Sequence, residues 1–241
     1  MDGPDRLVPL VYVDDLDDPV LALADHHHLA RVRRLRPGAA VSVGDGVGGW
    51  RPARFGERCE PDGPILRQAR PEPTLTVAFA LTKGDKPEVA VQALTEVGVD
   101  RIVPFVAERT VVRWAPDKAA RNAARLRAVA REAGMQSRRA WVPEVADVAG
   151  FDTIAALAAE GEGAALAHPD GGPPPTRLHT LLIGPEGGWS ASEEAAIAGR
   201  VRLGPHVLRA ATAAVVGGAL LVALREASGC RSAVLHPPGW L

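Results

Sequence analysis

The sequence predicts an α/β fold, with a small β-rich module followed by a parallel sheet that carries helices on both faces. From residue 73 onward, short apolar runs alternate with segments of helical periodicity. Two of the later runs stop at Gly184-Pro185 and Gly204-Pro205, as buried strands do on entering turns. The first 72 residues contain short strands between glycine turns, which is typical of a small barrel. We therefore expect two domains, residues 1–72 and 73–241.

Composition and termini restrict the possible functions. The 241 residues are 46% hydrophobic and 24% charged, as in an ordinary globular protein. The formal net charge is −1, so a nucleic-acid binder of this kind needs local basic patches. Cys59 and Cys230 fit no metal-ligand spacing, and we expect free thiols in a reducing compartment. The acidic N-terminus is no signal peptide, and the apolar run 213–224 is too short to span a bilayer. We expect a cytoplasmic protein without membrane or metal.

The first module predicts short strands and one basic helix. Its expected elements are a strand at 8–13, a helix at 25–35, a hairpin of 41–43 and 50–55, and a strand at 65–69. On the expected helix, Arg33 and Arg36 can share one face and Arg31 and Arg34 another, next to His26–His28. Such a charge run is either a solvated surface or a phosphate-binding surface. Consecutive histidines cannot all converge on one ion, which argues against a metal site.

The second domain alternates strands and helices. The expected strands are 75–81, 102–106, 164–167, 181–183 and 201–203, with 141–145 extended and a loop at 171–175. One expected helix ends at Gly98, and three others occupy 116–135, 151–159 and 212–226. One more helix begins near Ser190. Ser190 lies three residues before Glu193, the spacing of a capping box.

Three loops after the late strands predict a ligand site. Gly187 and Gly188 leave backbone groups accessible beside the first Gly-Pro, and a third loop, 206–211, leads into the last helix. The carboxyl ends of parallel strands are where α/β proteins bind ligands. Neither a dinucleotide fingerprint nor a phosphate-loop motif is present. Ordinary turns are the alternative, but two such strand ends with a neighbouring Gly-Gly favour a ligand site.

Several stretches resemble one family. LIGPEGGWS (182–190) and VRLGPHVLRAATA (201–213) resemble the signature of the RsmE family of ribosomal RNA methyltransferases, which belongs to the SPOUT superfamily. Residues 80–113 are similar to the family over their whole length, and residues 26–46 resemble the start of its PUA-like barrel. The resemblance implies a SPOUT methyltransferase domain with a C-terminal trefoil knot, preceded by a small PUA-like RNA-binding β-barrel.

The resemblance also implies an activity. The family methylates N3 of a uridine in 16S ribosomal RNA with S-adenosylmethionine as cofactor, so the expected partners are 16S ribosomal RNA or the small ribosomal subunit. We expect the cofactor to bind largely through loop backbone. The expected cofactor residues are Ile183, Gly184, Pro185, Glu186, Gly187, Gly188, Leu203, Gly204, Leu208, Arg209, Ala210, Thr212 and Ala213.

The expected RNA-binding residues are Arg31, Arg33, Arg34, Lys83, Gln136, Ser137 and Arg139. Gln136, Ser137 and Arg139 match the family's Gln-Ser-x-Arg motif, and Arg139 is the catalytic candidate for stabilising charge that develops on the uridine. Glu186 is a possible general base, although a carboxylate in a glycine turn more often caps N–H groups.

The sequence departs from the family at two positions. Met135 replaces a residue that is usually acidic, and Ala211 replaces a frequent glutamate. A mechanism that needs a carboxylate at 211 therefore fails here, whereas backbone contacts survive. The alternatives are a SPOUT methyltransferase for another RNA position or for transfer RNA, and a catalytically silent RNA-binding module.

The last helix predicts a homodimer. Residues 212–227 are apolar nearly all round, and such a helix is buried on several sides. One side can pack on its own sheet, and we expect the other to cross its copy about a two-fold axis. Gly217 and Gly218 would permit close approach at that interface.

Overall fold

The chain forms two compact units, which we describe separately. The computed structural model describes residues 3–5, 7–82, 87–159, 163–229 and 234–235. Unit 1 comprises the residues up to Pro71, Arg131–Val142 and the residues from Ser232 onward, and unit 2 comprises Glu72–Ala130 and Pro143–Arg231. Residues 131–142 therefore group with unit 1, although the sequence places them in the second domain. The reason is packing, because Met135 contacts the core of unit 1.

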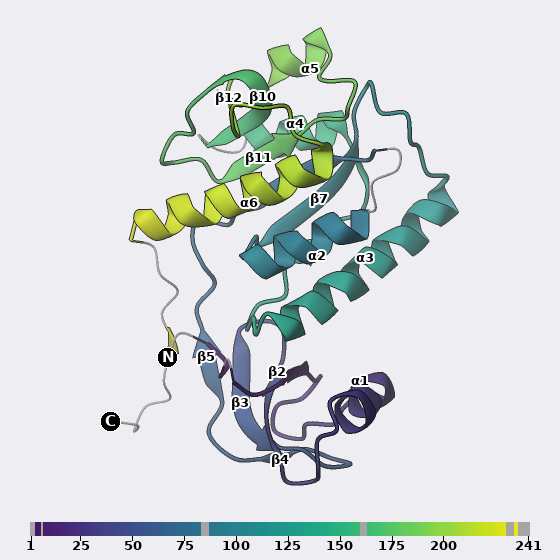
Figure 1. Cartoon of the computed structure of the whole chain (residues 1–241), viewed down its shortest axis with the longest axis vertical. Helices are drawn as coiled ribbons and strands as arrows, with labels where there is room; N and C mark the ends of the chain where they lie inside the picture. The colour runs from purple at the N-terminus through teal and green to yellow at the C-terminus, as the bar shows by residue number, and fades with distance from the viewer. Residues whose placement is uncertain (1–2, 6, 83–86, 160–162, 230–233, 236–241) are drawn as a thin grey trace. The chain divides into compact units, whose positions relative to one another are not determined.

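Unit 1 is built on a six-stranded sheet (Figure 1). Its strands are β1 (Leu10–Tyr12), β2 (Ala40–Gly44), β3 (Gly49–Arg54), β4 (Glu60–Pro61), β5 (Leu66–Gln68) and β13 (Val234–Leu235). The order is β1-β2-β3-β5-β13, with β4 on β3, and only the β1–β2 pair is parallel among the described strands. Cys59 is a free, buried thiol, and burial raises its pKa, whereas Cys230 lies outside the described residues.

The basic helix of unit 1 ends earlier than the sequence predicts. α1 (Leu23–His27) continues as the π-helical turn η1 (His28–Val32) and stops there. Arg34 has a φ of 55°, in the left-handed region, and the Leu35 N–H bonds to the Leu29 carbonyl at 3.0 Å. A left-handed residue just after the C-cap reverses the chain, which is a common way for a helix to end. The expectation that Arg33 and Arg34 lie on helix faces is therefore wrong: both are exposed just after the helix.

Unit 2 contains a seven-stranded sheet in which every described pair is parallel. Its strands are β6 (Thr76–Ala80), β7 (Arg101–Val106), β8 (Glu144–Val145), β9 (Ala149–Gly150), β10 (Ala164–Gly172), β11 (Thr180–Ile183) and β12 (Arg200–Val201). Their order is β12-β10-β11-β6-β7-β8, with β9 on β7. The parallel sheet that the sequence predicts is confirmed.

Strand β10 is longer than the sequence predicts. It includes Gly171 and Gly172, which the sequence assigns to a loop. Gly172 pairs with Val201 of β12, and a Cβ on Gly171 would lie 2.5 Å from the Val201 carbonyl carbon. Gly171 therefore lets two backbones approach closely, a use of glycine that local turn rules do not distinguish from a turn.

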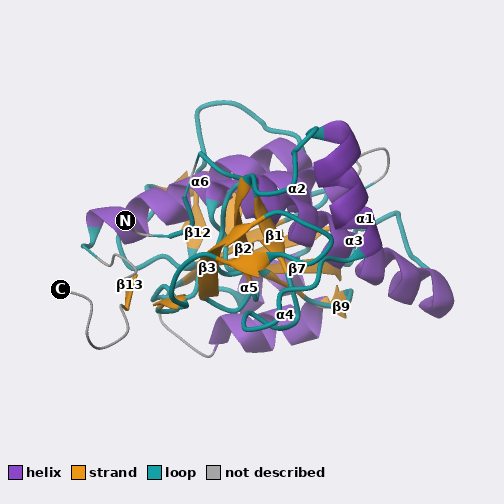
Figure 2. Ribbon diagram, turned by 90° about the horizontal axis from the view of Figure 1, so that it is seen from below, coloured by secondary structure: helices purple, strands orange, loops and turns teal. Residues whose placement is uncertain are grey.

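Helices cover both faces of the unit 2 sheet, as Figure 2 shows for α2 and α4. α2 (Pro87–Val97), α3 (Pro116–Gln136) and α6 (Ala210–Ala227) contribute to one core, and α4 (Phe151–Ala159) contributes to the other, together with Ile197 at the end of α5 (Ala191–Ala196). The alternation of β6 explains the two cores. Val77 and Phe79 face the first, and Ala78 and Ala80 face the second.

Helix α6 packs on two sides within its own unit (Figure 1). One side contacts the sheet through β6 and β11, and the other contacts the neighbouring helix α2. A Cβ on Gly217 would overlap the Leu181 side chain, and one on Gly218 would lie 2.7 Å from the Leu94 Cδ2. The glycines therefore permit close packing within the chain. The expectation that they lie at an interface between subunits is wrong, because the sequence does not reveal that α2 is a second internal partner.

Among the described helices, α6 is the one long and apolar enough to cross a membrane by length and composition alone. The sequence predicts a run too short to span a bilayer because only the apolar residues 213–224 are counted. The helix itself is longer and runs from Ala210 to Ala227. A core helix passes the same test, and Ala214 and Leu221 of α6 are fully buried against the sheet.

Candidate active site

The carboxyl ends of β6 and β11 lie side by side in the unit 2 sheet. Ile183, the last residue of β11, pairs with Phe79 of β6. The chain leaves β6 towards β7 on one side, whereas β10 and β11 lie on the other side of β6. The strand order thus reverses at this point. Such a reversal leaves a crevice outside the carboxyl ends of the strands, where open α/β sheets bind ligands.

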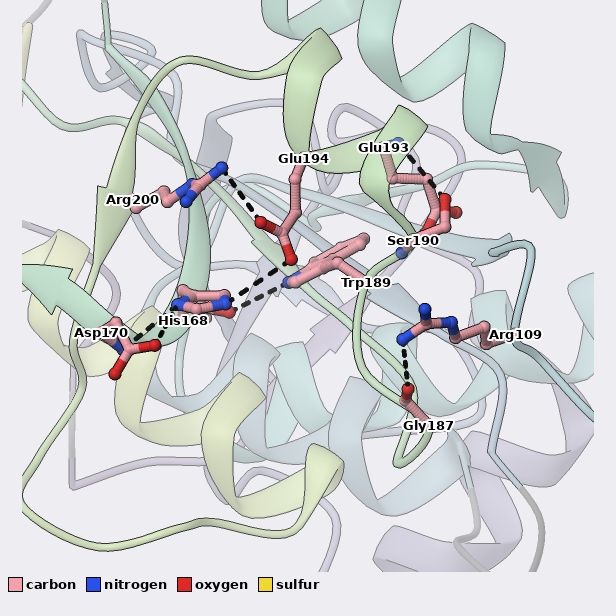
Figure 3. A network of polar contacts seen from close by, with 10 residues as sticks. Arg109, His168, Asp170, Gly187, Trp189, Ser190, Glu193, Glu194 and Arg200 are labelled. Atoms are coloured by element: carbon pink, nitrogen blue, oxygen red, sulfur yellow. Dashed lines mark hydrogen bonds and ion pairs between the residues drawn. The ribbon is translucent and has the colours of Figure 1, made fainter.

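The loop after β11 is a tight turn that packs against Arg109. The Gly188 N–H bonds to the Pro185 carbonyl at 2.9 Å, and Gly188 has a φ of 70°. The Arg109 Nη1 donates to the Gly187 carbonyl at 3.1 Å (Figure 3). A Cβ on Gly187 would lie 3.2 Å from the Arg109 Cβ. The turn thus needs glycine at 188 for its backbone angle and at 187 for space. Glu186 is exposed.

Trp189 fastens the end of this loop to the sheet. Its ring stacks on Phe105 with centroids 6.1 Å apart and an interplanar angle of 7°. Its Nε1 donates to the Ala167 carbonyl at 3.1 Å (Figure 3). A Cβ on Gly184 would lie 2.8 Å from the Trp189 Cε2. Gly184 therefore makes room for the indole, in addition to the cofactor role that the sequence predicts.

Glu193 joins the loop after β7 to the loop after β11. Its Oε2 accepts the Ser190 N–H at 2.9 Å while its own N–H donates to the Ser190 Oγ at 3.3 Å, so the expected capping box is present. Its Oε1 accepts the Glu108 N–H at 2.8 Å. The side chain is only 3% exposed. One buried carboxylate therefore satisfies backbone donors of two loops that meet only in the fold.

The second and third loops offer accessible backbone. No atom lies within 4 Å of the position that a Cβ on Gly204 would take. Leu203 and Leu208 are half-buried, and Arg209 is exposed. Arg209 is the N-cap of α6, with extended backbone and no side-chain capping bond. The first turn of this long helix therefore presents backbone N–H groups, which favour a negatively charged group.

All the expected cofactor residues belong to unit 2, where they lie on these three loops, at the end of β11 and in the first turn of α6. Their surroundings differ. Ile183, Pro185 and Ala213 are buried, and Thr212 is exposed. That these residues bind the cofactor, largely through backbone, stays a prediction.

Sequence analysis missed a polar network beside Trp189 (Figure 3). The His168 Nε2 lies 3.7 Å from the Glu194 Oε1, and Arg200 pairs with Glu194 at 3.0 Å. The His168 Nδ1 accepts the Asp170 N–H at 3.1 Å. These residues come from β10, α5 and β12, so no local motif signals them. Within the described residues, no group of three or more His, Cys, Asp or Glu side chains could hold a metal ion.

The described residues expected to contact RNA all lie in unit 1. Arg31, Arg33 and Arg34 are exposed around the end of η1, whereas Lys83 lies outside the described residues. Exposed guanidinium groups at a helix end suit phosphate contacts.

The Gln-Ser-x-Arg motif lies at the end of α3. Gln136 is exposed, the Ser137 Oγ donates to the Ala133 carbonyl at 2.7 Å, and the Arg139 carbonyl accepts the Tyr12 hydroxyl at 2.7 Å. Arg139 belongs to unit 1, whereas the three loops belong to unit 2. Neither unit by itself contains both the catalytic candidate and the cofactor loops.

Arg138 is a candidate phosphate-binding residue that the sequence alone does not indicate. It has a φ of 60°, and burial and the nearby Arg33 guanidinium lower its pKa. With Ser137 and Arg139 it lines a cavity of about 470 Å³ in unit 1. The neighbouring guanidinium groups of Arg33 and Arg138 create positive potential suited to a phosphate. Arg138 is the variable residue of the motif, and its proximity to Arg33 arises only in the fold.

Comparisons with known proteins identify both units. An RNA methyltransferase domain family matches residues 70–222, and an RNA methyltransferase PUA domain family matches residues 24–57. The chain is 36% identical over 233 residues to the ribosomal RNA small subunit methyltransferase E of Mycobacterium bovis, covering 86% of this chain and 88% of that protein. The chain belongs to the ribosomal RNA small subunit methyltransferase E family. The Synechocystis member is 32% identical over 227 residues, covering 86% of this chain and 73% of that protein.

Solved structures share the fold of this chain. A probable rRNA-methyltransferase from Porphyromonas gingivalis superposes with a TM-score of 0.77 at 26% identity, covering 92% of this chain and all of that one. The Neisseria gonorrhoeae methyltransferase E, solved bound to S-adenosylmethionine, gives 0.71 at 24% identity, covering 90% and 98%. The expected SPOUT-type α/β fold with a PUA domain is confirmed, and the trefoil knot stays a prediction.

Proposed function

We propose that this chain methylates N3 of a uridine in 16S ribosomal RNA, at position 1498 by the family pattern, with S-adenosylmethionine as methyl donor. The observation that carries the proposal is the glycine-rich loop after β11 at the reversal point of the sheet, in a chain of this family. The substrate implies a cytoplasmic protein that acts on 16S ribosomal RNA or the small ribosomal subunit.

The loop residues fit S-adenosylmethionine. The glycine turn and the open space at Gly204 leave backbone donors and acceptors for a polar ligand. Leu203 and Leu208 offer half-buried apolar surface to an adenine ring. The N-terminus of α6 favours the ligand's carboxylate.

The chemistry makes few demands on side chains. When bound, S-adenosylmethionine supplies a methyl group on a positively charged sulfur, and positioning matters more than covalent help. Uridine N3 carries a proton that must leave and that base pairing buries, so the base must be unpaired or flipped out. We assign the exposed arginines of unit 1 to phosphate contacts and retain Arg139 as the group that stabilises charge developing on the base.

Methylation of small subunits that lack the modification tests this function. The purified chain is incubated with S-adenosylmethionine and subunits from a strain deleted for its own family member, and the RNA is analysed by mass spectrometry. We expect N3-methyluridine at one position. Methylation elsewhere would indicate another RNA substrate. Failure both to methylate and to bind S-adenosylmethionine in calorimetry would indicate a silent RNA-binding module.

A further inference from the structure

Unit 2 contains a cavity of about 230 Å³ at the carboxyl end of β6. The end of β6, the start of α2, one face of α3 and the first residues of α6 line it. Ala210 and Ala211 are among these residues. The cavity therefore adjoins the third loop of the proposed cofactor site, although the sequence assigns no function to the α3 face that lines it.

One face of α3 gives the cavity its chemistry. Trp114 just precedes the helix, and Lys118, Asn122 and Leu126 follow at intervals of four residues, which places them along one side. Trp114 and Asn122 are half-buried, Lys118 is exposed, and Leu126 is fully buried. The cavity thus combines an aromatic ring, an ammonium group and a carboxamide with the carboxylate of Glu88, which pairs with Arg125 at 3.0 Å.

The size and the side chains indicate the occupant. Pockets for ligands of drug size span roughly 300–1,000 Å³, so this cavity is too small for a whole S-adenosylmethionine but matches a single ring. Enzymes that act on flipped bases stack them against aromatic or apolar side chains and hydrogen-bond their edges. Uracil has a carbonyl acceptor on each side of N3, and the Lys118 ammonium and the Asn122 amide both donate.

We propose that this cavity receives the flipped-out uracil ring, with Trp114 as the stacking surface and Lys118 and Asn122 as donors to its carbonyl oxygens. The proposal rests on the uridine methyltransferase function proposed above. Loss of the N3 proton places negative charge on the two oxygens, which a positive ammonium group stabilises. Cytosine presents an amino group in place of one carbonyl, so the Lys118 ammonium, which can only donate, favours uracil over cytosine.

Separate measurements on Asn122→Ala and Trp114→Ala test the assignment. We expect single-turnover methylation to fall at least tenfold, while the affinities for S-adenosylmethionine and for small subunits change less than twofold. Arg121→Ala is the matched control, because Arg121 is exposed on the same helix and does not line the cavity. Circular dichroism checks folding, and Asn122→Ala tests the proposal by itself should Trp114→Ala unfold.

Photocrosslinking provides a readout other than activity. A 4-thiouridine is placed at the position that the wild-type chain methylates, and the crosslinked peptide is identified by mass spectrometry. We expect a crosslink within residues 114–126, which the Trp114→Ala variant loses. Loss of S-adenosylmethionine affinity in Asn122→Ala would instead assign the cavity to the cofactor. A crosslink elsewhere, or unchanged methylation in both variants, would overturn the base pocket while leaving the methyltransferase function intact.

Discussion

At Gly187, a Cβ would lie 3.2 Å from the Arg109 Cβ and 3.4 Å from the Arg109 carbonyl oxygen. A valine there would push the turn away from Arg109 and shift the loop backbone that we assign to the cofactor. We expect Gly187→Val to lower S-adenosylmethionine affinity at least tenfold in calorimetry, with an unchanged circular dichroism spectrum. Gly172→Ala is the control, because no atom lies within 4 Å of the position its Cβ would take. Normal binding by Gly187→Val would place the site elsewhere.

Tyr12 is the single tyrosine of the chain, and its buried hydroxyl donates to the Arg139 carbonyl at 2.7 Å. We expect Tyr12→Phe to lower the free energy of unfolding by about 1–3 kcal/mol at pH 7, because a carbonyl loses its partner. Urea denaturation measures the difference.

Burial also raises the pKa of Tyr12 in the folded chain. The hydroxyl therefore contributes fully below the unfolded-state pKa of about 10, and the contribution is lost as the pH rises above it. We expect the difference between wild type and Tyr12→Phe to shrink above pH 10. An ultraviolet titration that shows tyrosinate forming near pH 10 in the folded chain would contradict the raised pKa.

At the scale of elements, the capping box of α5 does more than start a helix. Glu193 also holds the Glu108 N–H of the loop after β7. We expect Glu193→Ala to cost about 1–3 kcal/mol in urea denaturation, because it leaves buried N–H groups without partners. S-adenosylmethionine affinity should fall with it, since the two loops are no longer joined. Glu193→Gln keeps one acceptor, so its stability and its S-adenosylmethionine affinity should lie between those of the wild type and Glu193→Ala. Equal affinity in all three proteins would argue against coupling between this box and the cofactor loops.

Elements with strong periodicity could be predicted from the sequence. The helix expected at 151–159 has those bounds in the structure, and the one expected at 116–135 ends one residue later. Hydrophobic spacing alone determines such amphipathic segments. The first loop of the site could also be predicted, because the consecutive glycines and the Gly-Pro of 184–188 form a local pattern.

Features that depend on distant residues could not be predicted. The helix before Arg33 ends where it does because Leu35 turns back to pack in the core of unit 1. The network of His168, Glu194 and Arg200 joins three elements that are separate in sequence. The cavity that brings Trp114 beside Ala211 likewise exists only once α3 and α6 pack on the same face of the sheet.

At the scale of the whole molecule, a near-neutral chain must bind RNA through local charge. We expect the triple change of Arg31, Arg33 and Arg34 to Glu to weaken binding to small subunits at least tenfold. The slope of log K against log salt should fall by about 2–3, since each of the three lost phosphate contacts removes about 0.7–0.9 of a released counterion. The same charge change at Arg121, Arg177 and Arg202, which are exposed in unit 2, is the control. An unchanged slope in the first variant would exclude the patch.

The homodimer remains a proposal, and the structure changes where its interface is expected. The glycines of α6 pack inside the chain, so they cannot also face a second subunit. The exposed face of α6 presents small and apolar residues at helical spacing, Thr212, Val216, Ala219 and Ala223, and ends in the last turn with Glu226 and Ala227. A helix with such an outer face is suited to crossing its own copy about a two-fold axis. This stripe begins in the first turn of α6, where the cofactor residues lie, so we propose that the partner lies beside the site.

A charge placed on this face tests the dimer directly. We expect wild type to have a dimeric mass in light scattering, and Val216→Arg to be monomeric with lost methylation, because an unpaired charge is costly in a buried interface. Val20→Arg is the matched control, since Val20 is 50% exposed in unit 1 and Val216 is 37% exposed. A folded monomeric variant that keeps its S-adenosylmethionine affinity but not its activity would mean that the partner completes the RNA site. A monomeric wild type with full methyltransferase activity at the same concentration would refute the dimer as the active form.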